Sequence, residues 1–491
     1  MKRPLLIFAF LPALFAAQET HDHPAPEKLG TVSFQTSCKP DTQQQFNRAV
    51  ALLHSFAYEA ADNAFRSVSE QDPECAIAHW GIAMTLYHQL WEPPLSPSGI
   101  VVGQKELRQA AILEEGSERE RGFIHALSLV FEDASTVPYS TRASNYEGAM
   151  RSLSAANPND IEIQVFYGLA LISNASPSDK DHRKQKQAAD LLEPLWREVP
   201  DHPGIPHYLI HAYDSQELAS RGLTAARAYA SIAPSAPHAL HMPSHIFTRL
   251  GLWDDSIASN LAARSAAHRQ GDPGEELHAM DYLVYAYLQS DRDQEAAQVI
   301  EQLKAMKNLD LGDFKSGYAA TAMPIRYVVE RHQWNDAQKI VAPPDSTLPQ
   351  IRAIAAWARG LGFAHNGRII EARKESETLR DLERQLSKSK NDYWAAQVNI
   401  LTREVIAWSI QAEKKPKDAA ALLRSAADDE DRIEKLPVTP GPIIPAREQL
   451  GELLVEQRDF ASAVGTFETA LVNSPGRRGA LRGAAQITHS H

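Results

Sequence analysis

Histidines are concentrated in one short part of this chain. Of the nineteen histidines in the 491-residue sequence, eight lie between residues 202 and 278. The segments "PHYLIHAYD" (206–214), "PHALHMPSHIF" (237–247) and "EELHAMD" (275–281) supply the candidate metal-binding residues His207, His211, Asp214, His238, His241, His245, His278 and Asp281. Neutral imidazoles, with a carboxylate as ligand or as hydrogen-bonded partner, are typical ligands of zinc, copper and other late transition metals. The pattern therefore favours a transition-metal site.

Two other interpretations of these histidines stay open. Histidine and aspartate near helix N-termini can satisfy free backbone N–H groups and pack against tyrosines, which would make them a structural network. They can also line a groove that grips a peptide. A single H-x-x-x-H pair is a weak signal, but two such pairs on adjacent helices, with a further histidine beyond, are less easily dismissed.

The sequence lacks the signatures of several enzyme classes. Zinc proteases need a glutamate directly after the first histidine, as general base beside the metal-bound water, and here that position holds Tyr208 or Met242. Neither the G-x-S-x-G turn of hydrolases nor a phosphate-binding P-loop occurs. The C-x-x-C-H motif of covalent haem is also missing. A metal-dependent hydrolase or oxidoreductase stays an alternative function, with no substrate indicated.

A helical repeat carries the histidines. The segment 445–475 has the spacing of the tetratricopeptide (TPR) pattern at Leu450, Gly451, Ala463, Phe467, Ala470 and Pro475. The chain therefore resembles the TPR superfamily. Weaker starts of second helices occur at 255–256, 295–296, 336–337, 371–372 and 418–419. Together they predict an all-α, right-handed α-solenoid of TPR-like helical hairpins over residues 40–485, irregular in its middle. The proline-rich segment 436–445 is expected to cross to the last repeat as an extended linker.

The resemblance implies a binding function. The commonest role of the TPR superfamily is to hold a protein or peptide partner on the concave surface of the array. The segments "HWGIAM", "HYLIHAYD" and "HALHMPSHIFTRLGLW" are also similar to exported bacterial TPR-repeat proteins of undefined activity. The resemblance thus implies a fold, a compartment and a partner-binding scaffold, but no reaction.

Prolines place the histidines on consecutive first helices of the hairpins. Pro206 suits the first turn of a helix, so His207 lies near its N-terminus and His211 lies one turn further on the same face. Pro243 is expected to begin the next such helix, with His241 just before the helix and His245 within it. First helices of an array run side by side, about 10 Å apart, along the concave surface. We therefore expect the imidazoles to converge there on a metal ion, zinc or copper.

The first seventeen residues have the cationic start, apolar run and small final residues of a secretory signal peptide. A polar segment follows over 18–39. We therefore expect an exported protein, periplasmic or extracellular. A disulfide between Cys38 and Cys75 is favoured and would stabilise this end by about 4 kcal/mol, with two free buried thiols as the alternative. The net charge of −12 argues against nucleic acid as a partner, and no later stretch is long and apolar enough to span a membrane.

Overall fold

The computed structural model describes residues 27–91, 95–113 and 116–488, so the expected signal peptide (1–17) lies outside the described residues. Within these ranges the chain is helical and contains no strand. The N-terminal half comprises η1 (Pro40–Thr42), α1 (Gln43–His54), α2 (Tyr58–Gln71), α3 (Ala76–Met84), α4 (Pro97–Leu113), α5 (Glu118–Phe131), α6 (Tyr139–Ala156), α7 (Ile161–Ser173), α8 (Arg183–Glu198), α9 (Gly204–Tyr213), α10 (Ala219–Ile232), α11 (Pro237–His241) and α12 (Pro243–Arg249).

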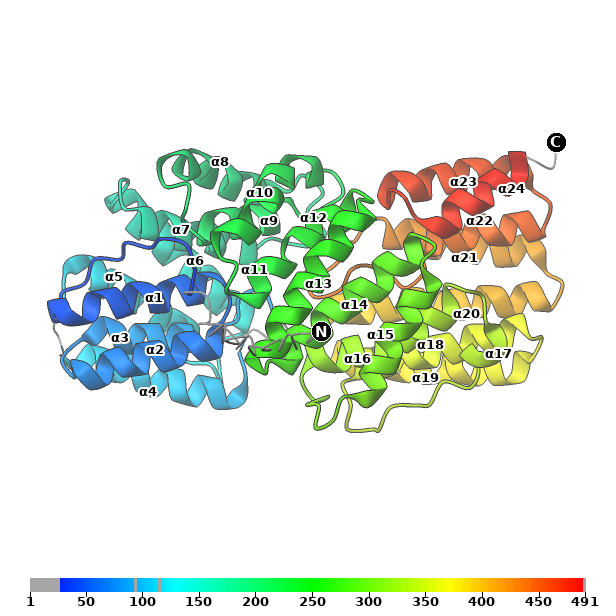
Figure 1. The fold of residues 1–491 in the computed structure, drawn as a ribbon. Helices are drawn as coiled ribbons and strands as arrows, with labels where there is room; N and C mark the ends of the chain where they lie inside the picture. Colours follow the sequence, from blue (N-terminus) through cyan, green and yellow to red (C-terminus); the bar gives the residue numbers. More distant parts are fainter. Residues whose placement is uncertain (1–26, 92–94, 114–115, 489–491) are drawn as a thin grey trace, which may run out of the picture.

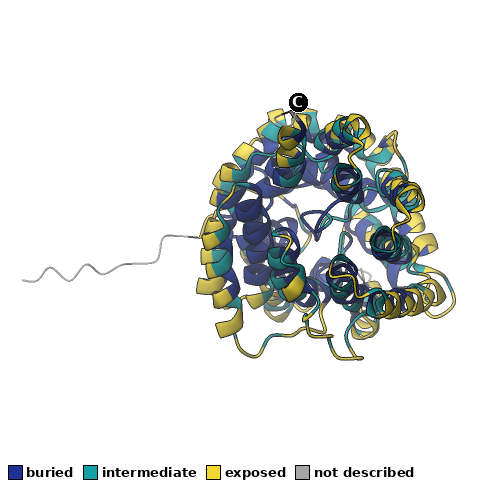
Figure 2. Ribbon diagram, turned by 90° about the vertical axis from the view of Figure 1, so that its right-hand side faces the viewer, coloured by how far each residue is buried: buried dark blue, intermediate teal, exposed yellow. Residues whose placement is uncertain are grey.

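The C-terminal half continues the same succession of helices. It comprises α13 (Trp253–Gln270), α14 (Pro273–Gln289), α15 (Asp293–Ala305), α16 (Phe314–Val329), α17 (Trp334–Ala337), α18 (Pro349–His365), α19 (Ile369–Lys388), α20 (Asp392–Ala412), α21 (Pro416–Glu430), α22 (Ala446–Glu456), α23 (Phe460–Asn473) and α24 (Arg478–Thr488). Figure 1 shows an elongated body with the two halves side by side. Seen end on in Figure 2, the helices form a ring whose exposed residues face outwards and whose buried residues face the interior.

Most hairpins share one turn geometry. A residue with positive φ stands two positions before the second helix at Phe56, Gly251, Asp291, His332, Gly367, Lys414 and Arg458. Five positions after each of these, the second helix carries a small, fully buried residue: Ala61, Ser256, Ala296, Ala337, Ala372, Ala419 and Ala463. Small residues let two helices approach closely, which is the requirement of a TPR-like hairpin. The predicted all-α solenoid of such hairpins is confirmed.

The hairpin α22–α23 shows how closely these helices pack. A Cβ atom at Gly451 would lie 2.5 Å from the ring of Phe467, so only glycine fits opposite that ring. Phe467 is fully buried, and α23 ends at Asn473, shortly before Pro475. The repeat at 445–475 therefore has the helix boundaries and the internal contact that its sequence pattern predicts.

Two features of the array differ from the simple repeat. The helix that begins near Asp336 ends after four residues, and the chain then runs without a helix to Pro349. The helix expected to begin at Pro243 does begin there, as α12, but a short additional helix, α11 (Pro237–His241), runs into it through Met242. Met242 keeps helical dihedral angles, but Pro243 has no N–H to donate to the preceding turn. His241 is the last residue of α11 and precedes α12, as expected.

The described part of the polar N-terminal segment, 27–39, packs against the array. Phe34 is fully buried and stacks near Phe46, Trp80 and Phe123. Cys38 is bonded to Cys75, next to the start of α3. This stretch is therefore integrated in the N-terminal core, although its composition is mainly polar.

Residues 431–445, here called the strap, are non-helical and cross the interior of the ring. Val438, Ile443 and Ile444 on the strap are buried. The Tyr282 hydroxyl in α14 lies 3.2 Å from the carbonyl oxygen of Thr439. The strap thus does more than link two helices, because it covers part of the concave surface.

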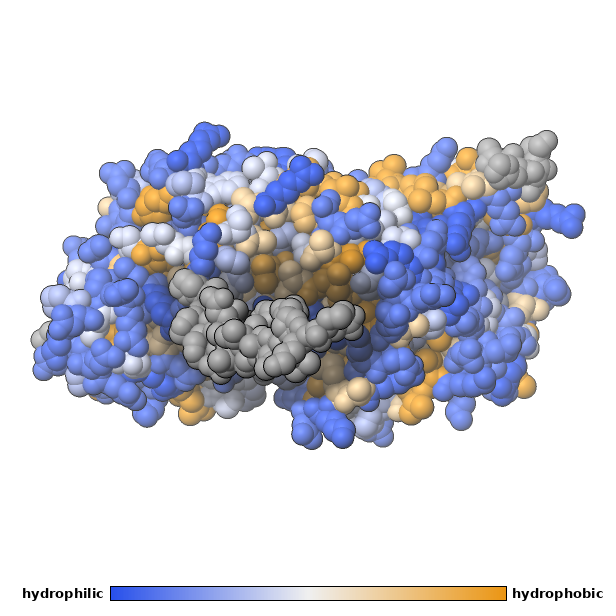
Figure 3. All heavy atoms as spheres, viewed as in Figure 1, coloured by the Kyte–Doolittle hydropathy of each residue, from blue (hydrophilic) through white to orange (hydrophobic). Residues whose placement is uncertain are grey.

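The outer surface is mostly hydrophilic. On the face drawn in Figure 3, hydrophobic residues gather in the middle, between the two halves, and over the C-terminal helices. Val472 and Leu481 in those helices are exposed. Among the described residues, no helix has the length and apolar character needed to cross a membrane.

Candidate metal centre

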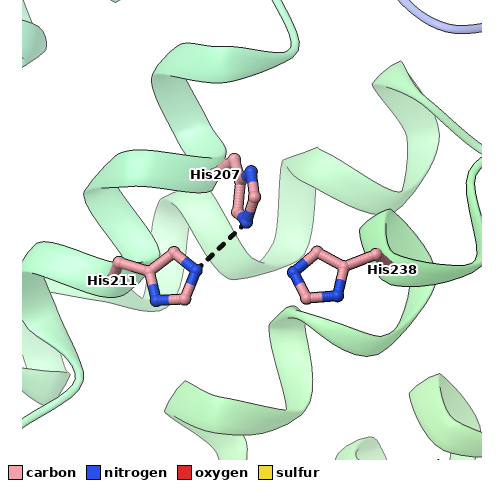
Figure 4. A group of neighbouring side chains, drawn as sticks. All are labelled: His207, His211 and His238. Atoms are coloured by element: carbon pink, nitrogen blue, oxygen red, sulfur yellow. Dashed lines mark hydrogen bonds between the residues drawn. The ribbon is translucent and has the colours of Figure 1, made fainter. Parts of the chain in front are cut away.

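Six histidines of the predicted set gather in the interior between α9, α11, α12 and α14. They form two groups, and within each group one ring nitrogen from every histidine lies within 4.8 Å of the others: His207, His211 and His238, and then His241, His245 and His278. Each of the six side chains belongs to a residue that is at most 8% exposed. Figure 4 shows the three rings of the first group converging on a common point. We call these groups triad A and triad B.

Triad A combines two histidines of α9 with one of α11. The Nδ1–H of His207 donates to the backbone carbonyl of His54 at 2.6 Å, which leaves Nε2 as the acceptor atom of this ring. This Nε2 lies 3.1 Å from Nε2 of His211. His211 Nδ1 and His238 Nε2 are buried and have no hydrogen-bond partner. An unpaired buried polar atom costs about 1–3 kcal/mol, so triad A is poorly satisfied by protein groups alone.

Triad B is built in the same way from α11, α12 and α14. His241 Nδ1 lies 2.6 Å from Asn260 Oδ1, and His245 Nδ1 lies 2.8 Å from Asp214 Oδ2. The amide nitrogen of Asn260 donates to the carbonyl of Ser256, so its oxygen faces His241. Both rings therefore carry their proton on Nδ1.

The two Nε2 atoms of triad B consequently face each other as lone pairs. They are 3.1 Å apart, a hydrogen-bond distance, yet neither ring has a proton there when neutral. The Tyr282 hydroxyl is 3.5 Å from His245 Nε2, but its single proton has nearer acceptors in the carbonyl oxygens of the strap. A cation between the two nitrogens would remove this repulsion.

Four imidazoles of the triads are held in the neutral form that metal ligation requires. Burial lowers the pKa of His245 to about 4, although the Asp214 carboxylate opposes this effect. Burial, with the neighbouring imidazoles, also lowers the pKa of His207, His211 and His241 well below the ordinary value. These rings are therefore free bases at neutral pH.

Two carboxylates outside the triads are neutralised by cations of their own. Asp214 accepts from Arg249 Nε at 2.9 Å and from Lys435 Nζ at 2.8 Å. Burial raises the pKa of Asp214, but Lys435 and Arg249 outweigh burial and hold that pKa well below its ordinary value. Glu275 accepts from Lys315 at 2.6 Å and lies 3.3 Å from His238 Nδ1. Asp214 and Glu275 thus orient imidazoles from outside, as partners of metal-bound histidines often do.

The two aspartates of the predicted set have different contact partners. Asp214 lies 2.8 Å from the ring of His245 in α12 and orients it. Asp281 contacts no histidine of the triads; its Oδ1 is 3.5 Å from Nε of the fully buried Arg326. The expectation that Asp281 serves the histidines stays a prediction, and the structure gives this buried carboxylate the electrostatic partner Arg326.

Three residues of the site were missed at the level of sequence. Asn260, Glu275 and Lys435 come from separate helices or from the strap, and none has a spacing that relates it to a histidine it serves. Only Glu275 carries a local signal, since it lies one helical turn before His278.

A third buried group contains His54, Glu162 and His202. Glu162 lies between the two rings, with its oxygens 2.9 Å from His54 Nε2 and 3.1 Å from His202 Nε2. His54 Nδ1 lies 2.9 Å from the hydroxyl of Tyr208. Both Nε2 atoms and the carboxylate are satisfied, so this group is a hydrogen-bonded network that fixes the carbonyl to which His207 donates.

The comparisons with known proteins concern the fold. No family model matches the chain, and no curated protein matches it. Among solved structures, a monomeric mutant of IFIT1 with m7Gppp-AAAA is similar at 10% identity over 93% of this chain and 96% of that one, with a TM-score of 0.37. The structure of Naa15/Naa10 bound to HypK is similar at 12% identity over 91% of this chain and 66% of that one, with a TM-score of 0.25. These similarities extend no further than helical architecture.

Proposed function

We propose that this chain is an exported TPR-like protein that binds a transition metal, zinc or copper, at the six-histidine cluster inside its solenoid. The observation that carries the proposal is the pair of unprotonated Nε2 atoms in triad B, 3.1 Å apart. Two nitrogens bound to one tetrahedral zinc ion at about 2.0–2.1 Å stand about 3.3–3.4 Å apart. The two rings therefore need to move only slightly to hold an ion.

The compartment is part of the same proposal. The N-terminal signal pattern and the Cys38–Cys75 disulfide both fit a periplasmic or extracellular location, where disulfides persist. In that location the protein meets zinc and copper outside the buffered cytosol. Export would therefore bring the protein to the compartment in which it binds the metal.

Metal analysis of the purified protein tests the proposal. We expect the untagged protein, stripped with a chelator and exposed to zinc or copper, to retain at least one ion per chain. His241→Ala/His245→Ala should retain fewer ions than the wild type. His79→Ala/His88→Ala, which removes two histidines outside the triads, should retain as many as the wild type.

A measurement on the wild type alone guards against a variant that does not fold. A metal that binds only the folded state raises its free energy of unfolding, so the loaded protein should melt at a higher temperature than the chelated protein. The absence of bound metal in the wild type, after exposure to both ions, would overturn the proposal.

A partner-binding scaffold is the second candidate function. A pocket on the concave side, next to the strap, is lined by Tyr318, Tyr393, Trp394, Glu430 and Arg447. Aromatic surfaces with charges of both signs suit a protein or peptide ligand. Such a partner would lie beside the strap and not on the triads, which the strap covers.

A further inference from the structure

The two triads form one continuous cluster. The ring centres of His211 and His245, in different triads, are 5.9 Å apart, and those of His238 and His241 are 6.1 Å apart. Within triad B, His245 and His278 are 6.4 Å apart. The separation between the triads is therefore no larger than a separation inside one of them.

The cluster also repeats with the helices that carry it. Each triad takes two histidines four residues apart from one helical segment and a third from the next helix on the concave side. The interrupted helix α11–α12 serves both triads, with His238 in one and His241 and His245 in the other. Two equivalent ligand sets of three imidazoles thus stand side by side.

A small cavity lies between the two sets. It is bounded by two histidines of each triad and closed by apolar side chains: His211, His238, His245, His278, Phe56, Leu90, Trp91, Pro437 and Val438. Triad nitrogens near this cavity include the unpartnered Nε2 of His238. The cavity has room for an uncharged ligand of about the size of one water molecule, in contact with both sets of histidines.

Electrostatics distinguish the ions that this cluster can hold. The six imidazoles contribute no negative charge, while Asp214 and Glu275 are already balanced by Arg249, Lys435 and Lys315. The cost of burying an ion rises steeply with its charge. Two divalent ions would bring four uncompensated charges into a dry interior, whereas two Cu(I) ions would bring two, and imidazole is a good ligand for copper.

We propose that the two triads form a dinuclear copper(I) centre, with one ion in each triad and a small uncharged ligand between them. This inference rests on the metal-binding function proposed above. It assigns the number of ions, their identity and the place of an exogenous ligand.

Anaerobic titration of the chelated wild type with Cu(I) tests the number and identity of the ions. We expect binding to end at two equivalents per chain, and an equal concentration of zinc to leave the bound copper in place. The double variant His207→Ala/His211→Ala should bind one equivalent of Cu(I) per chain. An end point at one equivalent in the wild type, or displacement of copper by zinc, would overturn the dinuclear copper centre while leaving metal binding intact; failure to bind any metal would instead remove the proposed function.

Carbon monoxide, which binds Cu(I), probes the cavity by infrared absorption. The copper-loaded wild type should bind it, and Val438→Trp, which fills the cavity from the strap, should keep two coppers and lose carbon monoxide binding. If Val438→Trp binds carbon monoxide as well as the wild type does, the cavity is not the ligand site. Val438→Ala, which leaves the cavity open, is the matched control.

Discussion

At the scale of single residues, chemistry in this protein depends on which hydrogen bond fixes each imidazole. The motifs around His211 and His278 are alike, each with an aspartate three residues later. Asp214 reaches an imidazole of the neighbouring helix, whereas Asp281 is taken by Arg326. Spacing therefore predicts that a carboxylate lies nearby but not which group it serves.

Asn260 is the residue whose role can be tested without touching a ligand. Its oxygen holds His241 in the tautomer that presents Nε2. Because outer hydrogen bonds of this kind are worth 10–100-fold in metal affinity, we expect Asn260→Ala to weaken metal binding by about 10-fold. Competition with a chromogenic chelator measures the change. Asn399→Ala, in α20 away from the triads, is the control, and equal affinities in the two variants would argue against a positioning role.

A pH effect is expected at Glu404, which is fully buried in α20 and accepts from Trp357. Burial raises the pKa of Glu404 to about 7, although Arg403 opposes this effect. Between about pH 4.5 and 7 the unfolded chain releases this proton and the folded chain keeps it, so the free energy of unfolding falls as pH rises. We expect Glu404→Gln, which stays neutral, to exceed the wild type in stability by on the order of 1–3 kcal/mol at pH 8.

The pH dependence of the stability gain of Glu404→Gln distinguishes the titration of Glu404 from a change in packing. At pH 4.5 the carboxyl is largely protonated in the native state, so the gain of Glu404→Gln should shrink towards zero. Urea unfolding at the two pH values measures the difference. Glu468→Gln, exposed in α23, controls for a general effect of charge. A gain of equal size at both pH values would mean that the titration of Glu404 is not its cause.

At the scale of helices, the sequence was informative wherever contacts are local. The acidic residue and following alanine that mark second helices correspond to a turn with positive φ and a buried small residue, all within about ten residues. The strap is different, because its partners are far away in sequence: Lys435 pairs with Asp214, 221 residues earlier. Prolines predict that this segment is not helical, but not that it enters the ring.

The glycines of the last hairpin test the packing of these helices. Gly451 faces the ring of Phe467, whereas a Cβ atom at Gly465 would meet nothing within 4 Å. We expect Gly451→Ala to destabilise the protein by about 1–3 kcal/mol through overpacking. Gly465→Ala should instead stabilise it by about 0.5–1 kcal/mol, since alanine loses less conformational entropy in a helix. Chemical denaturation compares the two, and equal effects would contradict the close approach at Gly451.

At the scale of the whole molecule, the histidine cluster lies where the two halves meet. Its histidines come from α9, α11, α12 and α14, and the strap brings Lys435 from the C-terminal half onto Asp214. Within the described residues, α16 to α24 have an apolar core of their own and a smaller core lies among α13 to α16, while Trp91 packs against both the N-terminal core and that of α16 to α24. A metal at the triads would therefore add a link between two halves that have separate main cores.

This arrangement predicts that metal binding slows the opening of the strap. A metal on His245 fixes Asp214 through their hydrogen bond, and Asp214 holds Lys435. If the strap opens only when the metal leaves, the free energy of opening the strap rises by about 2.7 kcal/mol at a metal concentration one hundred times the dissociation constant. Hydrogen exchange followed by mass spectrometry should show slower exchange over 434–439, with no change in α2. Lys435→Met should keep the metal and lose the added protection, and slowing confined to α9, α11 and α14 would show that the halves are not coupled by this route.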